Sequence, residues 1–255
     1  MVPTTDAGHP TDSGAPQPSD ASTSGQDAGV DAPAQGPDAS LGIHFTGTPK
    51  IMTFGDSITE ATCWRARLWE DLETHGYTSF KMVGSKNTSG NCNDNKYDGH
   101  NEGHSGYLIE NLANEEPNGE MDSWFSANPP DVLLMHMGTN DVWNKLSTQS
   151  ILSAYGVAID TLRKYAPNVV ILLAQIIPMN PSNCSVCAGG VQALDAAIPA
   201  WAATKSTSSS PIIVVDQWTG FSDSTDTYDG VHPNDSTGSQ KIADKWYSVL
   251  APMLP

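Results

Sequence analysis

Five short apolar runs punctuate this chain and predict the strands of its core. The last three are almost continuous in Val, Ile, Leu and Met, the pattern of strands that are buried on both faces of a sheet. The predicted strands cover residues 50–54, 80–85, 131–138, 169–177 and 211–218. Each run is too short to cross a bilayer, so we expect no membrane span.

Apolar side chains spaced three or four residues apart lie between these runs and predict amphipathic helices. Stripes of this kind cover residues 64–72, 151–162 and 242–250. Because strands and helices alternate, the pattern favours an α/β fold whose parallel sheet is covered by helices on both faces. Residues 86–104 are rich in Asn and Gly and are predicted to form a long loop of the kind that is often functional.

The first 42 residues show neither pattern. They are mainly Ala, Asp, Ser, Gly, Pro and Thr, with no aromatic residue and no Lys or Arg. Such a segment cannot bury enough apolar surface to offset the entropy of ordering it. We therefore expect residues 1–42 to be a disordered linker and residues 43–255 to be one folded domain. A linker of this composition is typical of a secreted or surface-tethered protein. Because Met1 runs straight into it with no signal peptide, we expect targeting residues to be missing.

Charge and cysteine content narrow the choice of partners and compartment. A formal net charge of −17 would repel nucleic acid and anionic membranes, so we expect neither as a partner. The cysteines are Cys63, Cys92, Cys184 and Cys187, and an even number in an exported chain favours disulfides. Of the three connectivities we prefer Cys63–Cys92 with Cys184–Cys187. A zinc site at the last two would need a second closely spaced pair, so we expect no metal.

Polar residues of types that take part in catalysis follow four of the predicted strands. They occur as "GDS" at 55–57, "EGHSGY" at 102–107, "GTND" at 138–141 and "DTYDGVHPND" at 226–235. In open α/β sheets, ligands bind beyond the carboxyl ends of the strands. Ser, Gly, Asn, Asp and His are therefore expected to converge on one rim of the sheet.

These residue types are the ones that acyl transfer needs. The reaction requires a hydroxyl nucleophile, a base, a group that orients the base, and donors for the developing oxyanion. We assign the first three roles to Ser57, His232 and Asp229. The backbone N–H groups of Ser57 and Gly106, together with the side-chain amide of Asn140, are expected to form the oxyanion hole.

Structural explanations remain open for several of these residues. Asp56 is predicted to be a helix N-cap, and Asp229 could simply form an Asx turn. His104 and His136 are expected to be structural histidines, and Arg65 is expected to pair with a buried acid.

The blocks "GDSIT", "GHSGY", "GTND" and "DGVHP" resemble, in order and spacing, the four signature blocks of the SGNH, or GDSL, hydrolase superfamily. By this resemblance Ser57, Gly106, Asn140 and His232 hold the four positions that give the superfamily its name, and Asp229 completes a triad. The implied fold is a flavodoxin-like three-layer α/β/α sandwich with a five-stranded parallel sheet.

Longer stretches, among them "GDSITEATCWR", "NPPDVLLMHMGTND" and "DTYDGVHPND", look like carbohydrate esterase family 3, whose members deacetylate xylan. One departure is Ala61-Thr62, where we would expect a Gly. The resemblance implies a serine esterase that needs no cofactor, and a monomer is the default expectation. It would remove O-acetyl groups from plant cell-wall xylan or xylo-oligosaccharides through an acetyl-enzyme.

Two alternatives remain beside this interpretation. The first is a broad small-acyl esterase or a deacetylase of another glycan, and the second is a catalytically silent carbohydrate-binding module. Tyr107 and Trp143 could form an aromatic wall for a sugar ring, although packing in the core explains both equally well.

Overall fold

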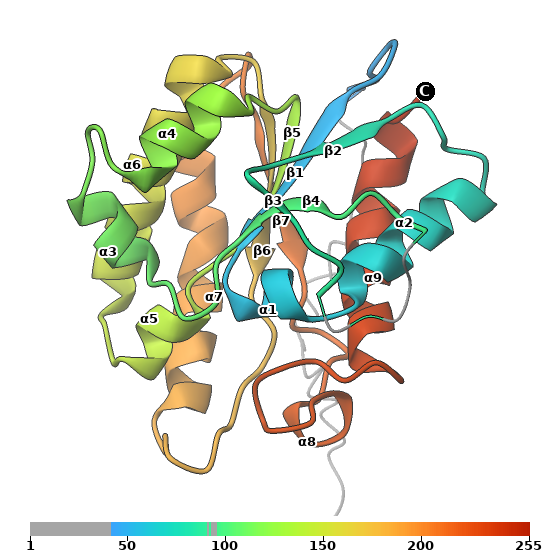
Figure 1. Ribbon diagram of the computed structural model, residues 1–255. Helices are drawn as coiled ribbons and strands as arrows, with labels where there is room; N and C mark the ends of the chain where they lie inside the picture. The colour runs from blue at the N-terminus through green and yellow to red at the C-terminus, as the bar shows by residue number, and fades with distance from the viewer. Residues whose placement is uncertain (1–41, 91, 93–95) are drawn as a thin grey trace, which may run out of the picture. The chain divides into compact units, whose positions relative to one another are not determined.

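The computed structural model describes residues 42–90, 92 and 96–255 (Figure 1). Apart from Gly42, the linker predicted at residues 1–42 lies outside the described residues. The described chain forms a sheet with helices on both of its faces, the α/β/α sandwich that the sequence predicts.

Five parallel strands form the main part of the sheet. They are β1 (Lys50–Gly55), β2 (Lys81–Val83), β5 (Val132–His136), β6 (Val170–Gln175) and β7 (Ile212–Asp216). Their order across the sheet is β2-β1-β5-β6-β7, the flavodoxin-like order. The five predicted strands are thus confirmed, and all of them end on the same edge.

Two further strands lie inside the region predicted to be a loop. Strand β4 (His100–Gly103) runs parallel to the end of β1, and β3 (Lys86–Asn87) runs antiparallel to β4, so the sheet formed by the described residues has seven strands. The sequence prediction is wrong here because both strands are short and polar and show no apolar alternation. Gly103 allows β4 to lie close to the helix after β1, since a Cβ there would come within 2.6 Å of the Glu60 nitrogen.

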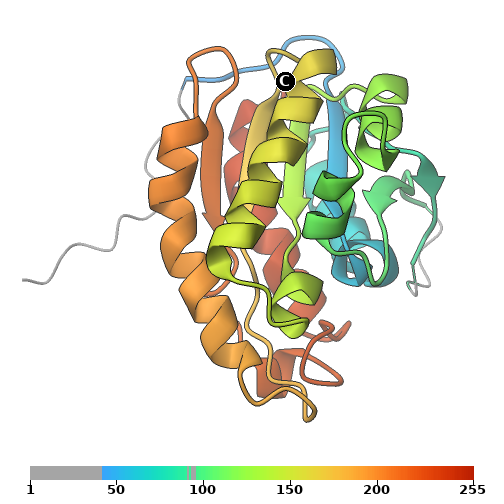
Figure 2. The ribbon, with the colours of Figure 1, turned by 90° about the vertical axis from the view of Figure 1, so that its left-hand side faces the viewer.

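Apart from three short helices at strand ends, the helices of the described chain fall into two groups. On one face of the sheet α2 (Trp64–Thr74) packs against α9 (Gly238–Leu250), which continues into a 3₁₀ turn at Ala251–Met253. The opposite face carries α3 (Ile109–Asn114), α4 (Glu120–Ala127), α6 (Thr148–Tyr165) and α7 (Cys187–Lys205), and Figure 2 shows α6 and α7 lying side by side across it. Three short helices follow strand ends: α1 (Ser57–Ala61), α5 (Thr139–Trp143) and α8 (Asp223–Asp226).

One aromatic pair joins the two helices on one face of the sheet, and another links the sheet to the opposite helical layer. Trp64 of α2 and Trp246 of α9 are fully buried, with ring centroids 6.2 Å apart. On the other face, Phe54 of β1 meets Phe125 of α4 edge to face at 5.5 Å. Burial of each such side chain contributes roughly 1.5–3 kcal/mol, so the core holds the strand ends at fixed positions.

No helix among the described residues is long and apolar enough to span a bilayer. The structure pairs Cys63 with Cys92 and Cys184 with Cys187, which is the connectivity we prefer from the sequence.

Candidate active site

The predicted nucleophile Ser57 is the first residue of α1, directly after the buried strand β1. Asp56 is the N-cap of this helix, as predicted, and its Oδ1 accepts a hydrogen bond from the Ile58 nitrogen at 3.0 Å. The turn needs Gly55, because a Cβ there would lie 2.6 Å from the His136 carbonyl oxygen. Burial raises the pKa of Asp56 to about 6, although the hydrogen bond from Ile58 opposes this shift.

The predicted base and its orienting acid come from the loop before α9. Ser57 Oγ lies 2.9 Å from His232 Nε2, and His232 Nδ1 lies 2.7 Å from Asp229 Oδ2. Asp229 Oδ1 also accepts from the backbone nitrogens of Val231, at 3.0 Å, and His232, at 2.8 Å. Although burial would raise the pKa of Asp229, these hydrogen bonds outweigh it and lower that pKa. The structure therefore brings the three predicted residues together in series.

The two remaining oxyanion candidates lie on neighbouring loops. Gly106 has a φ of +83°, which places the loop in the left-handed region, and the His104 nitrogen anchors that loop to the Gly55 carbonyl at 2.8 Å. Asn140 of α5 donates from Nδ2 to the Tyr107 carbonyl oxygen at 3.0 Å. Since a side-chain amide has two N–H groups, this contact fixes the amide of Asn140 and leaves its second hydrogen available.

Gly138 sets the position of Asn140. Its φ is +112°, and an added Cβ would lie 2.7 Å from the Tyr155 hydroxyl oxygen. That hydroxyl donates to the Met137 carbonyl at 2.5 Å, and burial raises its pKa well above the usual value. The strand end and the start of α5 are thereby held against the buried helix α6.

Asp141 joins the Asn140 loop to the Gly106 loop. Its carboxylate is fully buried and accepts from the backbone nitrogens of Ile109 and Glu110, both at 3.0 Å, at the start of α3. Burial raises its pKa, and the same two hydrogen bonds oppose that shift. Because anions are favoured at helix N-termini, the residue after Asn140 stabilises the segment after Gly106.

Glu60, to which the sequence analysis assigned no role, ties α1 to the Gly106 loop. Its Oε2 accepts from the Ser105 nitrogen at 2.7 Å, and its Oε1 lies 2.6 Å from Lys86 Nζ. Burial would raise the pKa of Glu60, but these partners outweigh it and lower the pKa to about 2. The one sequence signal was its place in α1, one helical turn after Ser57.

Tyr228 is a second residue that the sequence analysis missed. Its side chain is 64% exposed, and its ring stacks on that of His232 at a centroid distance of 5.6 Å and an interplanar angle of 12°. Its place four residues before His232 gave no sign of this contact, because stacking depends on how the loop folds back. The Tyr228 nitrogen donates to the His232 carbonyl at 3.1 Å and closes that loop.

Tyr107 and Trp143, which were predicted to form an aromatic wall, both pack in part against other residues of the protein. Tyr107 is half-buried, and its ring centroid lies 5.1 Å from that of His104 and 6.2 Å from that of Trp124. Trp143 is also half-buried and packs against the core. Their contact with substrate stays a prediction.

His104 and His136, the two histidines expected to be structural, both have structural partners. His104 Nε2 lies 2.7 Å from Glu102 Oε1, and its ring stacks on Trp124 at 3.9 Å. His136 Nε2 accepts from the Ile177 nitrogen at 3.3 Å, and burial lowers the pKa of His136 to about 4.

The prediction for Arg65 is wrong. The side chain is 2% exposed and donates to backbone carbonyl oxygens instead of a carboxylate. These acceptors belong to Thr59, Glu60, Thr88 and Gly99. The guanidinium has five N–H donors and so can satisfy several carbonyls at once, and burial lowers its pKa.

A parallel α/β/α sandwich with a hydroxyl, an imidazole and a carboxylate hydrogen-bonded in series at its carboxyl edge is the arrangement of a serine hydrolase. The hydroxyl can attack an acyl carbon while the imidazole takes its proton and the carboxylate holds the imidazole in place. Among the described residues, no group of three or more His, Cys, Asp or Glu is placed to hold a metal ion.

Residues 53–237 match the GDSL-like Lipase/Acylhydrolase family, and the chain belongs to this family. It is a carboxylic ester hydrolase. A "Multidomain esterase" of Ruminococcus flavefaciens is 32% identical over 223 residues, which cover 80% of this chain. The match covers 28% of that relative, so this chain spans less than a third of its length.

Two solved structures resemble this fold over 80% of the chain. A carbohydrate esterase family 3 protein from Talaromyces cellulolyticus is 34% identical, with 97% of that chain covered and a TM-score of 0.72. A serine-to-alanine mutant of an acetyl esterase, crystallised with an acetate ion, is 33% identical, with 95% of that chain covered and a TM-score of 0.70.

Proposed function

We propose that this esterase removes O-acetyl groups from xylan or xylo-oligosaccharides. The observation that carries the proposal is the hydrogen-bonded series Ser57–His232–Asp229 at the carboxyl edge of the sheet. The similarity to a family 3 carbohydrate esterase and to an acetyl esterase supports acetate as the acyl group and a glycan as the alcohol. The sequence blocks that resemble family 3 support xylan as that glycan.

In this mechanism Ser57 Oγ attacks the acetyl carbonyl carbon while His232 Nε2 accepts the hydroxyl proton. The negative charge on the former carbonyl oxygen is stabilised by the N–H groups of Ser57 and Gly106 and by the free amide hydrogen of Asn140. When the tetrahedral intermediate collapses, the bond to the sugar oxygen breaks and His232 returns the proton to that oxygen. An acetyl-enzyme on Ser57 remains.

Water completes the cycle. His232 takes a proton from the water as it attacks the acetyl carbon, a second oxyanion forms in the same hole, and the proton goes to Ser57 Oγ as acetate leaves. Asp229 keeps the proton of neutral His232 on Nδ1, so that Nε2 faces Ser57 as an acceptor, and stabilises the imidazolium that forms.

We also propose that the protein is secreted or surface-tethered and acts as a monomer, with residues 1–42 as a linker. The two disulfides support an oxidising compartment, because disulfides are rare in reducing ones.

The test is acetate release from acetylated xylan by the wild type and by Ser57→Ala, with 4-nitrophenyl acetate and butyrate as comparison substrates. We expect release that disappears in the mutant and a strong preference for acetate over butyrate. Activity on the small esters alone would favour the broad small-acyl esterase. Activity on a different acetylated glycan would favour a deacetylase of that glycan.

A further inference from the structure

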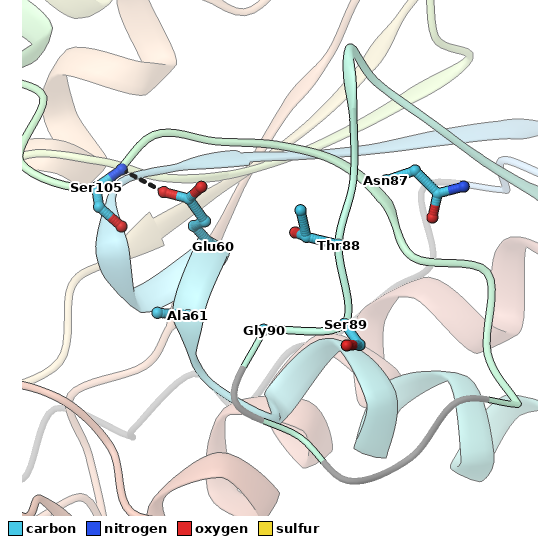
Figure 3. A pocket seen from close by; sticks show the side chains of 7 residues that line it. All are labelled: Glu60, Ala61, Asn87, Thr88, Ser89, Gly90 and Ser105. Atoms are coloured by element: carbon cyan, nitrogen blue, oxygen red, sulfur yellow. Dashed lines mark hydrogen bonds between the residues drawn. The ribbon is translucent and has the colours of Figure 1, made fainter.

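An open cavity of about 690 Å³ lies at the surface beside the candidate active site (Figure 3). Its size falls within the roughly 300–1,000 Å³ that is usual for small-molecule sites. One wall is formed by Glu60 and Ala61 of α1, and a second by residues 87–90. Ser105, hydrogen-bonded to Glu60, completes the lining.

Two of the residues that line the cavity, Glu60 and Ser105, are neighbours in the chain of residues of the acyl site. Glu60 lies one helical turn after Ser57 in the same short helix, and residues three apart in a helix are neighbours on its surface. Ser105 directly precedes Gly106, the proposed oxyanion donor. A molecule in the cavity therefore lies next to a group bound at Ser57.

Hydrogen bonds from Arg65 hold the two walls of the cavity in place relative to each other. The buried guanidinium of Arg65 donates to the Glu60 carbonyl on one wall, at 3.2 Å, and to the Thr88 carbonyl on the other, at 3.0 Å. Gly90 lies against α1, since a Cβ there would be 3.0 Å from the Glu60 carbonyl oxygen. These contacts hold the second wall at a set distance from α1 before any ligand binds.

The lining has the chemistry of a site for a neutral sugar. It offers the hydroxyls of Thr88, Ser89 and Ser105, the amide of Asn87 and the carboxylate of Glu60, and none of the described residues that line it is a Lys or Arg. Lys86 is already paired with Glu60, and the buried Arg65 donates to backbone carbonyls of both walls. Sugar hydroxyls can donate to these oxygens, whereas the carboxylate of a uronic acid would meet the Glu60 carboxylate and no Lys or Arg among the described lining residues.

We propose that this cavity binds a neutral pyranose ring of the leaving group, next to the acetylated sugar, and that it disfavours uronic acids there. The inference rests on the proposed function and makes it more specific. It places the recognition of the polysaccharide backbone on Glu60 and on residues 87–90, outside the groups that carry out the chemistry. Binding energy gained there from the remote part of the substrate would assist the reaction at Ser57.

A bulky side chain at the exposed Ser89 tests this assignment by filling the cavity. For Ser89→Trp we expect kcat/KM on an acetylated xylo-oligosaccharide to fall about tenfold more than kcat/KM on 4-nitrophenyl acetate, which is too small to reach the cavity. Ser208→Trp is the matched control, because Ser208 is an exposed loop serine before the amino end of β7. It should leave both values unchanged.

A second variant tests the charge argument. Ser89→Lys adds a cation to the lining, and we expect it to raise the rate on an acetylated galacturonan oligosaccharide relative to the rate on the xylo-oligosaccharide. Equal losses on the large and small substrates with Ser89→Trp, or an unchanged preference with Ser89→Lys, would overturn the assignment of the cavity.

A binding measurement separates this inference from the proposed function. Xylotetraose is titrated into Ser57→Ala, and the amide resonances of Ser89, Gly90 and Ser105 are followed by NMR. Shifts at these amides in a protein whose wild type releases no acetate from xylan would support the cavity and refute the proposed function. Acetate release by the wild type without such shifts would refute the cavity alone.

Discussion

Replacing Asp229 with Asn tests whether this carboxylate orients and stabilises His232 or only shapes a turn. The substitution keeps the size of the side chain, and the remaining carbonyl oxygen can still accept from the Val231 and His232 nitrogens, as Oδ1 does now. The new NH₂ group would face His232 Nδ1, where the carboxylate now lies at 2.7 Å. Two donors cannot share that contact, so His232 must move its proton to Nε2 or turn away from Ser57.

The size of the expected loss in kcat follows from how exposed the His232–Asp229 pair is to solvent. The imidazolium that forms during the reaction gains about 1 kcal/mol from a carboxylate 4 Å away in water and about 4 kcal/mol at an effective dielectric constant near 20. The side chains of His232 and Asp229 are 22% and 41% exposed, which places the pair between these limits. A loss of about 2–3 kcal/mol corresponds to a fall in kcat of about 30- to 150-fold.

The assay is the hydrolysis of 4-nitrophenyl acetate by wild type, Asp229→Asn and the control Asp235→Asn, with the thermal midpoint of each protein measured in parallel. Asp235 is an exposed acid in the same loop, so its variant controls for the loss of one negative charge. A loss below about fivefold for Asp229→Asn, in a protein with an unchanged midpoint, would refute the orienting role and leave the Asx turn as the explanation.

Three further predictions follow from the same structure. Asn140→Ala should lower kcat on 4-nitrophenyl acetate by about 10²–10³ with little change in KM, because its free amide hydrogen acts on the oxyanion; a change confined to KM would contradict this role. Burial, together with the charge of Asp216, raises the pKa of Asp195 to about 8 despite a hydrogen bond from Ile176. Because the folded state then holds this proton more tightly than the unfolded state, stability should fall as the pH rises from about 4 to about 8, and the thermal midpoint of Asp195→Asn should fall less over that range. Trp246→Ala removes a fully buried ring that packs on Trp64 and should cost about 3–5 kcal/mol in urea unfolding; a loss below about 1 kcal/mol would mean that the two helices repack.

The parts of the fold that could be predicted depend on local pattern. Strands β5 and β6 are almost entirely buried, so their apolar runs were visible without any knowledge of their neighbours. The N-cap at Asp56 was equally local, since capping involves only the next turn of the same helix.

The features that the sequence analysis did not predict depend on contacts between segments that are distant in the chain. Strand β4 exists because it pairs with the end of β1, and its polar sequence carries no sign of that pairing. The carbonyl groups that Arg65 contacts are present in every sequence, so nothing in the residue types distinguishes them from a buried acid as a partner. The cavity beside Ser57 was hidden for the same reason, because residues 60–61, 87–90 and 105, which line it, come from three separate segments.

The same distant contacts explain why such short blocks could indicate the site. The parallel sheet already aligns the strand ends, so each block needs only to place one loop relative to the next. The His104 nitrogen bonds to the Gly55 carbonyl, and Asn140 bonds to the Tyr107 carbonyl, so the first block positions the second and the second positions the third. The fourth block, which contains Asp229 and His232, is joined to the first by the 2.9 Å contact between His232 Nε2 and Ser57 Oγ. Because backbone groups hold the first three blocks together, side chains outside the blocks, such as those of residues 87–90 in the cavity, can differ without disturbing the reacting groups. We expect substrate specificity to be set at such positions.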